Sequence, residues 1–237
     1  LTAILDAYAA EQPPEAVESS GSDQLSLFER RVTIPTDPVK SERVWKGLKT
    51  HLGRNQRRKL FDAYLSGDPG VETMIYRFVR DAIPGRSARR SEAHLASHIQ
   101  IEKLCMKVRR EAHRMKGFVR FRQTDDDRYL ALVAPRYDVL PLIRQHFESR
   151  FADQTWIIYD TSRYYGLCYD RHKTRELRLD IGDIKVPGND NVGNEQLCQT
   201  LWQRYFSAVN ISSRNNPKLH LRQLPRRYWR YLPEKQS

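Results

Sequence analysis

Cysteine and long apolar runs are the features that this sequence most clearly lacks. Only three cysteines occur among the 237 residues, at Cys105, Cys168 and Cys198, and no two of them form a C-x-x-C pair. A dispersed, odd set predicts reduced thiols in a cytoplasm and gives no cysteine-based zinc or iron–sulfur site. No apolar run approaches the ~20 residues that a membrane helix needs, and no signal peptide is visible. We therefore expect a cytoplasmic protein without membrane contact and without a cofactor.

Several motifs of common enzymes are also missing. The chain has no glycine-rich phosphate loop, no G-x-S-x-G segment, no C-x-x-x-C-x-x-C cluster and no internal repeat. The nearest approach to a metal site is His94, His98 and Glu102, which one helix would align at four-residue spacing. The glutamate that a zincin helix carries between its histidines is absent, and no fourth ligand is evident. We therefore expect an exposed helix face there and no metal.

Positive charge is what the sequence has in excess, and it is concentrated. The formal net charge is +12, and the isoelectric point is near 9.8. Residues 107–122 hold seven Lys or Arg and one acid, and residues 214–231 hold six Lys or Arg and no acid. Each window therefore carries a net +6, and the rest of the chain is neutral by formal count. Two concentrated cationic windows predict an anionic partner, with nucleic acid first among the candidates.

The first window belongs to the stretch 103–122, which we expect to be a basic helix followed by a strand. Apolar residues recur at three- and four-residue spacing and so share one helix face. They are Ile101, Leu104, Val108, Ala112 and Met115. Gly117 is expected to end the helix in a left-handed conformation. One edge of the element would then anchor a core, while the other offers lysines and arginines to phosphates.

In the second window, arginines interleave with aromatic residues. The cations are Arg226, Arg227 and Arg230, and the rings are Tyr228, Trp229 and Tyr231. Cations beside aromatic faces suit unpaired bases, which stack on the rings while guanidinium groups hold the backbone. The alternative is a C-terminal arm whose rings pack into the protein's own core, with the arginines outward. In both cases the arginines can contact phosphates.

The order of hydrophobic patterns predicts an α+β fold in a single domain, 1–237. Helical patterns dominate residues 1–116 and strand patterns dominate 117–185, and a helix followed by the basic aromatic tail is expected over 193–237. The mainly antiparallel sheet is expected to have about five strands. They are Phe118–Gln123, Arg128–Ala134, Thr155–Asp160, Tyr164–Tyr169 and Arg175–Ile181, with a helix from Asp138 between the second and the third.

Capping and apolar spacing predict the remaining helices. Thr36-Asp37-Pro38 has the capping oxygen and the proline of a helix start. Two apolar stripes are expected to be buried, one through Val44, Trp45, Leu48 and Leu52, and the next through Leu60, Phe61, Tyr64 and Leu65. The second of these helices should end at Gly67. The helix expected after residue 193 carries Leu197, Leu201, Tyr205 and Val209.

Acid–base or nucleophilic chemistry has weak support in the sequence. Glu111, His113 and Lys116 lie close together beside the cationic row, so His113 is a candidate general acid or base, and Lys116 a candidate Schiff-base former. However, a helix separates Glu111 from His113 by about 200°, so that these two cannot form a local pair. The simpler interpretation is that His113 donates a hydrogen bond to a phosphate or to the fold.

Four long segments of the chain resemble a bacterial family described as "probable DNA metabolism protein". They are ERVWKGL (Glu42–Leu48), REAHRMKGFVRF (Arg110–Phe121), VLPLIRQHFESRFADQTWIIYD (Val139–Asp160) and NPKLHLRQLPRRYWRYLPE (Asn216–Glu234). Members are encoded beside a radical-SAM protein of DNA modification or repair, and related domains are fused to a uracil-DNA-glycosylase-like domain. Members also begin with a short strand and a Y-D-G-S-like segment, which the resemblance places before Leu1, so we expect a truncated N-terminus. The resemblance implies a setting in DNA repair, and it transfers no catalytic residue.

Our leading hypothesis is a DNA-binding accessory protein of DNA repair or modification that acts with a radical-SAM partner. The residues expected to contact nucleic acid are Lys107, Arg109, Arg110, Arg114, Lys116, Arg120, Arg122, Lys218, Arg226, Arg227, Tyr228, Trp229 and Arg230. Two alternatives stay open. One is a DNA-processing enzyme, a glycosylase, lyase or nuclease, that uses His113 or Lys116. The other is an adaptor that binds only a protein partner through its aromatic tail.

Overall fold

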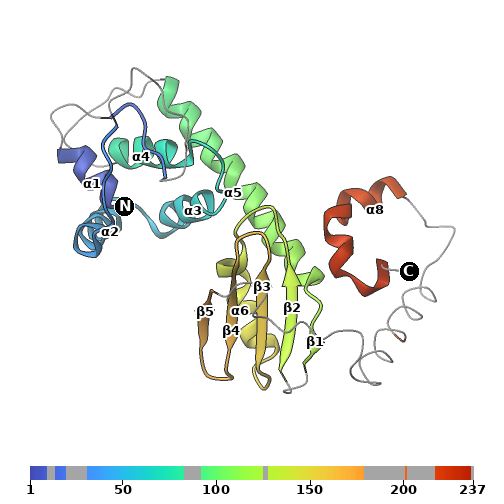
Figure 1. Cartoon of the computed structure of the whole chain (residues 1–237). Coiled ribbons are helices and arrows are strands. Elements are labelled where there is room, and N and C mark those ends of the chain that lie inside the picture. The colour runs from blue at the N-terminus through green and yellow to red at the C-terminus, as the bar shows by residue number, and fades with distance from the viewer. Residues whose placement is uncertain are drawn as a thin grey trace. The chain divides into compact units, whose positions relative to one another are not determined.

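The computed structural model describes residues 1–9, 14–19, 31–82, 92–124, 128–178, 201 and 217–235. It has the predicted α+β class, with helices first, then a five-stranded sheet, then short helices (Figure 1). The chain divides into two compact units, Leu1–Arg109 and Arg110–Ser237, which we call the helical unit and the sheet unit. The single domain expected from the sequence stays a prediction. None of the helices in the described ranges is long and apolar enough to span a membrane.

The helical unit is built from short helices and the first part of one long helix. The helices are α1 (Thr2–Ala9), α2 (Pro38–His51), α3 (Arg54–Tyr64), α4 (Val71–Ala82) and α5 (Glu92–Phe118). Helix α2 begins where the sequence predicted, because the Asp37 carboxylate accepts hydrogen bonds from the backbone N–H groups of Val39 (2.8 Å) and Lys40 (3.1 Å). These bonds satisfy two amides that a helix leaves unpaired at its start. After α3, Gly67 has φ 58°, the left-handed conformation expected at a helix end.

The core of the helical unit confirms part of the two predicted apolar stripes. The predicted members that are buried are Val44, Leu48, Leu52, Leu60 and Leu65. Three other members were predicted wrongly, because the rings of Trp45, Phe61 and Tyr64 are 38%, 47% and 57% exposed. In α3 the buried positions Leu60 and Ala63 share a face, and each ring sits one residue further along. One residue is a rotation of about 100° on a helix, which turns Phe61 and Tyr64 toward solvent.

Helix α5 buries the predicted face in full. Ile101, Leu104, Val108, Ala112 and Met115 are all less than 9% exposed. The expected stop at Gly117 is wrong, since the helix continues to Phe118, and the Val119 N–H donates to the Met115 carbonyl at 3.1 Å. The last turn of α5 therefore keeps a regular helical hydrogen bond. The strand that follows begins later than predicted.

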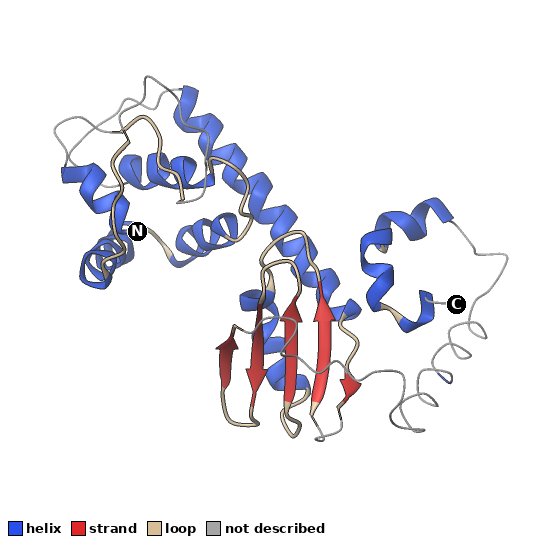
Figure 2. Ribbon diagram, in the orientation of Figure 1, coloured by secondary structure: helices blue, strands red, loops and turns tan. Residues whose placement is uncertain are grey.

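Within the described residues the sheet has five strands, in the order β1-β2-β3-β4-β5 (Figure 2). They are β1 (Arg122–Gln123), β2 (Tyr129–Val133), β3 (Trp156–Asp160), β4 (Tyr165–Tyr169) and β5 (Thr174–Leu177). Only β2 and β3 pair in parallel, with helix α6 (Leu140–Arg150) as the crossover, and the other three pairs are antiparallel. The carboxyl ends of β2 and β3 consequently lie together at one end of the sheet, with Val133 opposite Asp160. The mainly antiparallel sheet is confirmed.

An aromatic cluster holds α6 against one face of this sheet. The Phe147 ring of α6 lies 6.2 Å from the Trp156 ring of β3 and 5.7 Å from the Phe121 ring. On the neighbouring strand Gly166 is required by close packing, because a Cβ there would meet the Ile158 carbonyl oxygen at 2.8 Å. Burial of these large rings supplies much of the hydrophobic stabilisation of the sheet unit.

The basic aromatic tail is helical over its described part. It forms α8 (Pro217–Gln223) and two 3₁₀ helices, η3 (Arg226–Tyr231) and η4 (Pro233–Lys235). Helix η3 contacts β2, so the tail packs on the sheet unit. Tyr228 and Leu232 are almost fully buried there, at 2% and 1% exposure. The helix expected through Leu197, Tyr205 and Val209 lies outside the described residues.

Candidate nucleic-acid interface

The single acid of the first basic window joins the two windows together. Glu111, on α5, is 3% exposed. Its carboxylate accepts hydrogen bonds from the Tyr228 hydroxyl, from Arg227 Nη2 at 3.3 Å and from the Arg136 backbone N–H at 2.8 Å. A buried carboxylate is tolerated only when it is paired in this way. The residue that looked like a minor interruption of the basic row therefore anchors the second basic window to the first.

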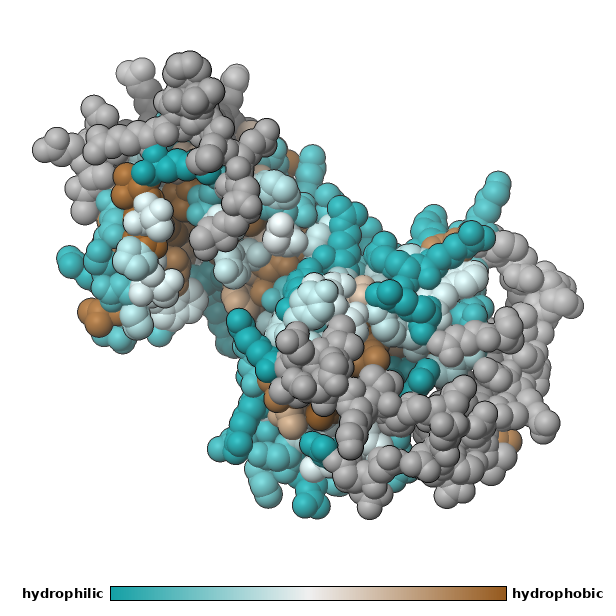
Figure 3. Space-filling view, viewed as in Figure 1, coloured by the Kyte–Doolittle hydropathy of each residue, from teal (hydrophilic) through white to brown (hydrophobic). Residues whose placement is uncertain are grey.

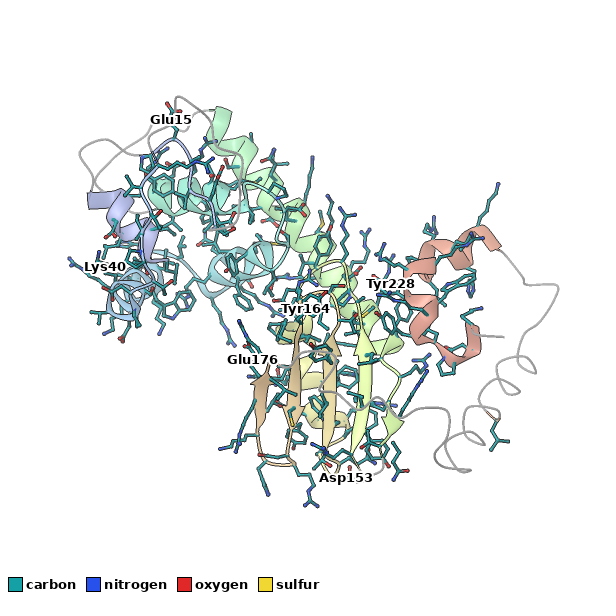
Figure 4. The ribbon with its side chains drawn as sticks, in the orientation of Figure 1. Glu15, Lys40, Asp153, Tyr164, Glu176 and Tyr228 are labelled. Carbon is teal, nitrogen blue, oxygen red and sulfur yellow. The ribbon has the colours of Figure 1, made fainter. Side chains whose placement is uncertain are left out.

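Further contacts extend this junction along both windows. Arg114 Nη2 donates to the Arg222 carbonyl at 3.2 Å, and the Phe118 ring lies 5.4 Å from the Tyr228 ring. Arg120 forms an ion pair with the buried carboxylate of Glu234 at 2.8 Å. Figure 4 shows Tyr228 on the side of the C-terminal helices that faces β2 and α5. Segments about 100 residues apart in the chain thus form one continuous region of the sheet unit.

We call the cations of this region the basic surface. They are Arg110, Arg114, Lys116, Arg120, Arg122, Lys218, Arg222, Arg226, Arg227 and Arg230. All of them are exposed except Arg114, Arg120 and Arg122, which are partly buried. In Figure 3 the surface over α8 and the neighbouring end of α5 is mostly hydrophilic. Two acids that contact it, Glu111 and Glu234, are buried beneath the arginines, so neither presents its negative charge to solvent.

Two predicted residues belong to the helical unit instead. Lys107 is exposed on α5. Arg109 forms an ion pair at 2.5 Å with Asp62, whose side chain is 1% exposed. A buried aspartate needs such a partner, so the charge of Arg109 is used within the helical unit. We therefore leave Arg109 out of the basic surface.

The interleaved arginines and rings of the tail contact one another. The guanidinium carbons of Arg226, Arg227 and Arg230 lie 5.8, 4.7 and 4.6 Å from the ring centroids of Trp229, Tyr228 and Tyr231 respectively. This cation–π geometry limits the rotamers of the arginines and lets them point outward over inward rings. The structure therefore agrees with the second interpretation of the tail, in which the rings pack inward and the arginines point outward.

Tyr228 and Trp229, which were predicted to stack on a base, therefore do not present free rings to solvent. Tyr228 is 2% exposed, so a base cannot reach its ring, and the stacking role predicted for it is wrong. Burial raises the pKa of Tyr228, as does its hydrogen bond to Glu111, which keeps the hydroxyl protonated as a donor. Trp229 is half-buried, donates through Nε1 to the Leu224 carbonyl at 3.0 Å, and already contacts Arg226 and Lys235.

The candidate catalytic residues do not form a site in this region. His113 and Lys116 are both exposed, while Glu111 points inward to Tyr228 and Arg227. Within the described ranges no three His, Cys, Asp or Glu side chains come together as metal ligands. The side chain of His94 lies outside the described residues. The geometry of the region is suited to holding an anion and offers no arranged acid–base pair.

Sequence reasoning missed three residues at the end of the parallel strand pair. Asp160 ends β3, is fully buried and forms an ion pair with Arg163 at 2.8 Å. Arg163 Nη2 also donates to the carbonyl of Arg136, whose own N–H donates to Glu111. These residues follow the carboxyl ends of β2 and β3, the part of a parallel sheet where ligands commonly bind. Sequence reasoning could have found these residues only if β2 and β3 had been predicted to run in parallel.

Comparison with known proteins places the chain in a family. A family model described as a domain of unknown function, DUF4130, matches residues 69–234, which is more than half of the chain. No curated protein matches the chain. No solved structure matches it either.

Proposed function

The chain belongs to the DUF4130 family of unknown function, and we propose that it is a DNA-binding protein that holds the phosphate backbone on its basic surface. The observation that carries this proposal is the junction at Glu111, where two basic windows about 100 residues apart meet. Lysines and arginines gathered in this way release condensed counterions from DNA when they bind it, whatever its base sequence.

The arrangement of the arginines supports phosphate contact rather than general solubility. Glu111 and Glu234 lie beneath the guanidinium groups of Arg227 and Arg120. The tail arginines are held by cation–π contacts with neighbouring aromatic rings. Because these contacts already restrict the side chains, the arginines lose less conformational entropy on binding. An arginine already held in place also presents its planar fork to phosphate oxygens at lower cost.

We further propose that this DNA binding serves DNA repair or modification together with a radical-SAM partner. The support is the resemblance of four long segments of the sequence to the "probable DNA metabolism protein" family. In this proposal the partner catalyses the reaction, and the present chain binds the DNA.

The proposal is tested by the salt dependence of DNA binding. If about six phosphates are neutralised, affinity should fall by around a thousandfold between 50 and 200 mM salt. Fluorescence anisotropy with a labelled oligonucleotide measures this directly. A flat salt dependence, or no retention of DNA at low salt, would contradict the proposal.

A pair of charge-matched variants assigns the binding to the basic surface. The test variant replaces three exposed cations of that surface: Lys218→Gln, Arg226→Gln and Arg230→Gln. The control variant removes three exposed cations around the β4–β5 turn: Arg171→Gln, Lys173→Gln and Arg175→Gln. The salt slope should fall by about 2–3 in the first variant, because each lost phosphate contact removes ~0.9. It should change little in the second, although both variants lose the same net charge.

A further inference from the structure

The turn between β3 and β4 presents an exposed tyrosine in a strained conformation. Tyr164 is 59% exposed and has φ 55°. Among the described residues no hydrogen bond, ion pair or ring contact holds its side chain. Bulky side chains are disfavoured in the left-handed region, which glycine or asparagine occupies at lower cost. A ring kept exposed at such a position indicates a role other than stability.

The turn that carries Tyr164 is itself tightly held. The buried Asp160 carboxylate accepts from the Ser162 N–H at 2.8 Å and from Arg163 Nη1 at 2.8 Å. The Thr161 N–H donates to the Val133 carbonyl at 2.9 Å. Figure 4 shows Tyr164 at the end of the sheet where β3 passes into β4. Because the backbone is fixed by these bonds, the ring is presented in a defined direction.

Hydrogen bonds and a cation–π contact connect this turn to the basic surface. The hydroxyls of Thr161 and Tyr231 share a hydrogen bond of 2.8 Å, and the guanidinium of Arg230 lies over the Tyr231 ring at 4.6 Å. From the same turn, Arg163 donates to the carbonyl of the exposed Arg136 at 2.8 Å. The turn that carries the exposed ring therefore contacts both the tyrosine that lies beneath Arg230 and the backbone of Arg136.

We propose that Tyr164 stacks on an unpaired base of single-stranded or locally opened DNA, while Arg136 and Arg230 hold the neighbouring phosphates. This inference rests on the proposed DNA-binding function and adds a preference for unpaired nucleotides. Only an unpaired base offers a free face, since the bases of a duplex are stacked on one another. A rigidly presented ring beside cations is the arrangement that single-strand binders use. Tyr228 is buried and Trp229 is in contact with two cations, which leaves Tyr164 as the exposed ring among the described residues of the sheet unit.

The test compares substitutions of Tyr164 that separate the ring from the backbone strain. Tyr164→Asn removes the ring and suits the left-handed conformation, so it should fold at least as stably as the parent. Tyr164→Phe keeps the ring. Tyr64→Asn is the matched control, because Tyr64 is a similarly exposed tyrosine, at 57%, in the helical unit. Binding is measured by anisotropy on a labelled single strand of about 20 nucleotides, longer than the ~4–16 that one module covers, and on the duplex of the same sequence.

Tyr164→Asn should weaken single-strand binding by about 5- to 150-fold, the range that corresponds to losing one stacked base. Its salt slope and its duplex affinity should match those of the parent, because no phosphate contact is removed. Tyr164→Phe and Tyr64→Asn should bind as the parent does. Equal affinity of Tyr164→Asn and the parent for the single strand would overturn the stacking role, and so would an equal loss on both substrates. If the parent itself bound neither substrate in a salt-dependent way, the proposed function would fail together with this inference.

Discussion

Replacing Tyr228 by phenylalanine removes the hydroxyl whose hydrogen bond holds the C-terminal helices to α5. The Tyr228 hydroxyl donates to the buried Glu111 carboxylate, and its ring packs 5.4 Å from the ring of Phe118. Phenylalanine keeps that ring and opens no cavity, so the change removes only polar contacts: the bond to Glu111 and the bond that the hydroxyl accepts from Arg227 Nη2 at 2.8 Å. The carboxylate retains Arg227 Nη2 at 3.3 Å and the Arg136 N–H at 2.8 Å.

The expected cost follows from the charge of the acceptor. A hydrogen bond to a charged group contributes about 1.5–3 kcal/mol, roughly twice the value for a neutral pair. The sheet unit should therefore lose about 1.5–3 kcal/mol of unfolding free energy in Tyr228→Phe. If residues 217–235 can also detach locally, the detached population should rise by about 10- to 150-fold, since 1.4 kcal/mol is a factor of ten.

Two measurements examine this prediction. Urea denaturation gives the unfolding free energy, and limited trypsin digestion followed by mass spectrometry gives the rate of cleavage at Arg222 and Arg226. Tyr64→Phe, at an exposed tyrosine, is the control and should change neither quantity. Combining Tyr228→Phe with Glu111→Gln should cost less than the sum of the two changes, because both remove the same contact. Parent-like stability of Tyr228→Phe, with unchanged cleavage, would show that this bond does not hold the tail.

Three further predictions concern stability. Gly166→Ala should destabilise the sheet unit by about 1–3 kcal/mol, because its Cβ would meet the Ile158 carbonyl oxygen, and urea denaturation that showed no loss would contradict this packing. Asp37→Ala should cost about 1 kcal/mol through the lost cap of α2, while Asp37→Asn should keep most of it, as a denaturation series would reveal. Burial raises the pKa of Asp138, although the Tyr165 hydroxyl donates to it. The folded state therefore binds a proton on Asp138 more tightly than the unfolded state does. The resulting stabilisation is fully present below the ordinary pKa of an aspartate, and it is lost as the pH rises through the raised pKa of the folded state. The stability of the parent relative to Asp138→Asn should accordingly fall as the pH rises above about 4, and a rise would refute the assignment.

The amino-acid sequence by itself determined the class of the fold and the buried face of its longest helix. The face through Ile101, Val108 and Met115 and the start of α2 at Asp37 were both predicted correctly. Helix and strand periods, and the capping of a helix start, depend on residues a few positions apart. The order of patterns was likewise sufficient for an α+β fold with a mainly antiparallel sheet.

Wrong local predictions arose where one residue of rotation or one hydrogen bond decides the outcome. Phe61 and Tyr64 are apolar enough for a core but lie one position past the buried face of α3. Gly117 is an effective helix stop in general, yet here α5 passes through it to Phe118. Side-chain chemistry alone does not distinguish these cases, because tertiary packing selects which face is covered.

Only the tertiary structure decided how the basic residues are arranged for binding. The charge windows were plain in the sequence, but their meeting at Glu111 depends on a buried contact between residues more than 100 positions apart. The same contact turns Tyr228 inward, whereas Tyr164, in a stretch of sequence without any motif, is exposed in the described part of the sheet unit. Contacts of this kind are fixed by the mutual satisfaction of buried polar groups and by packing, neither of which is encoded in a local pattern.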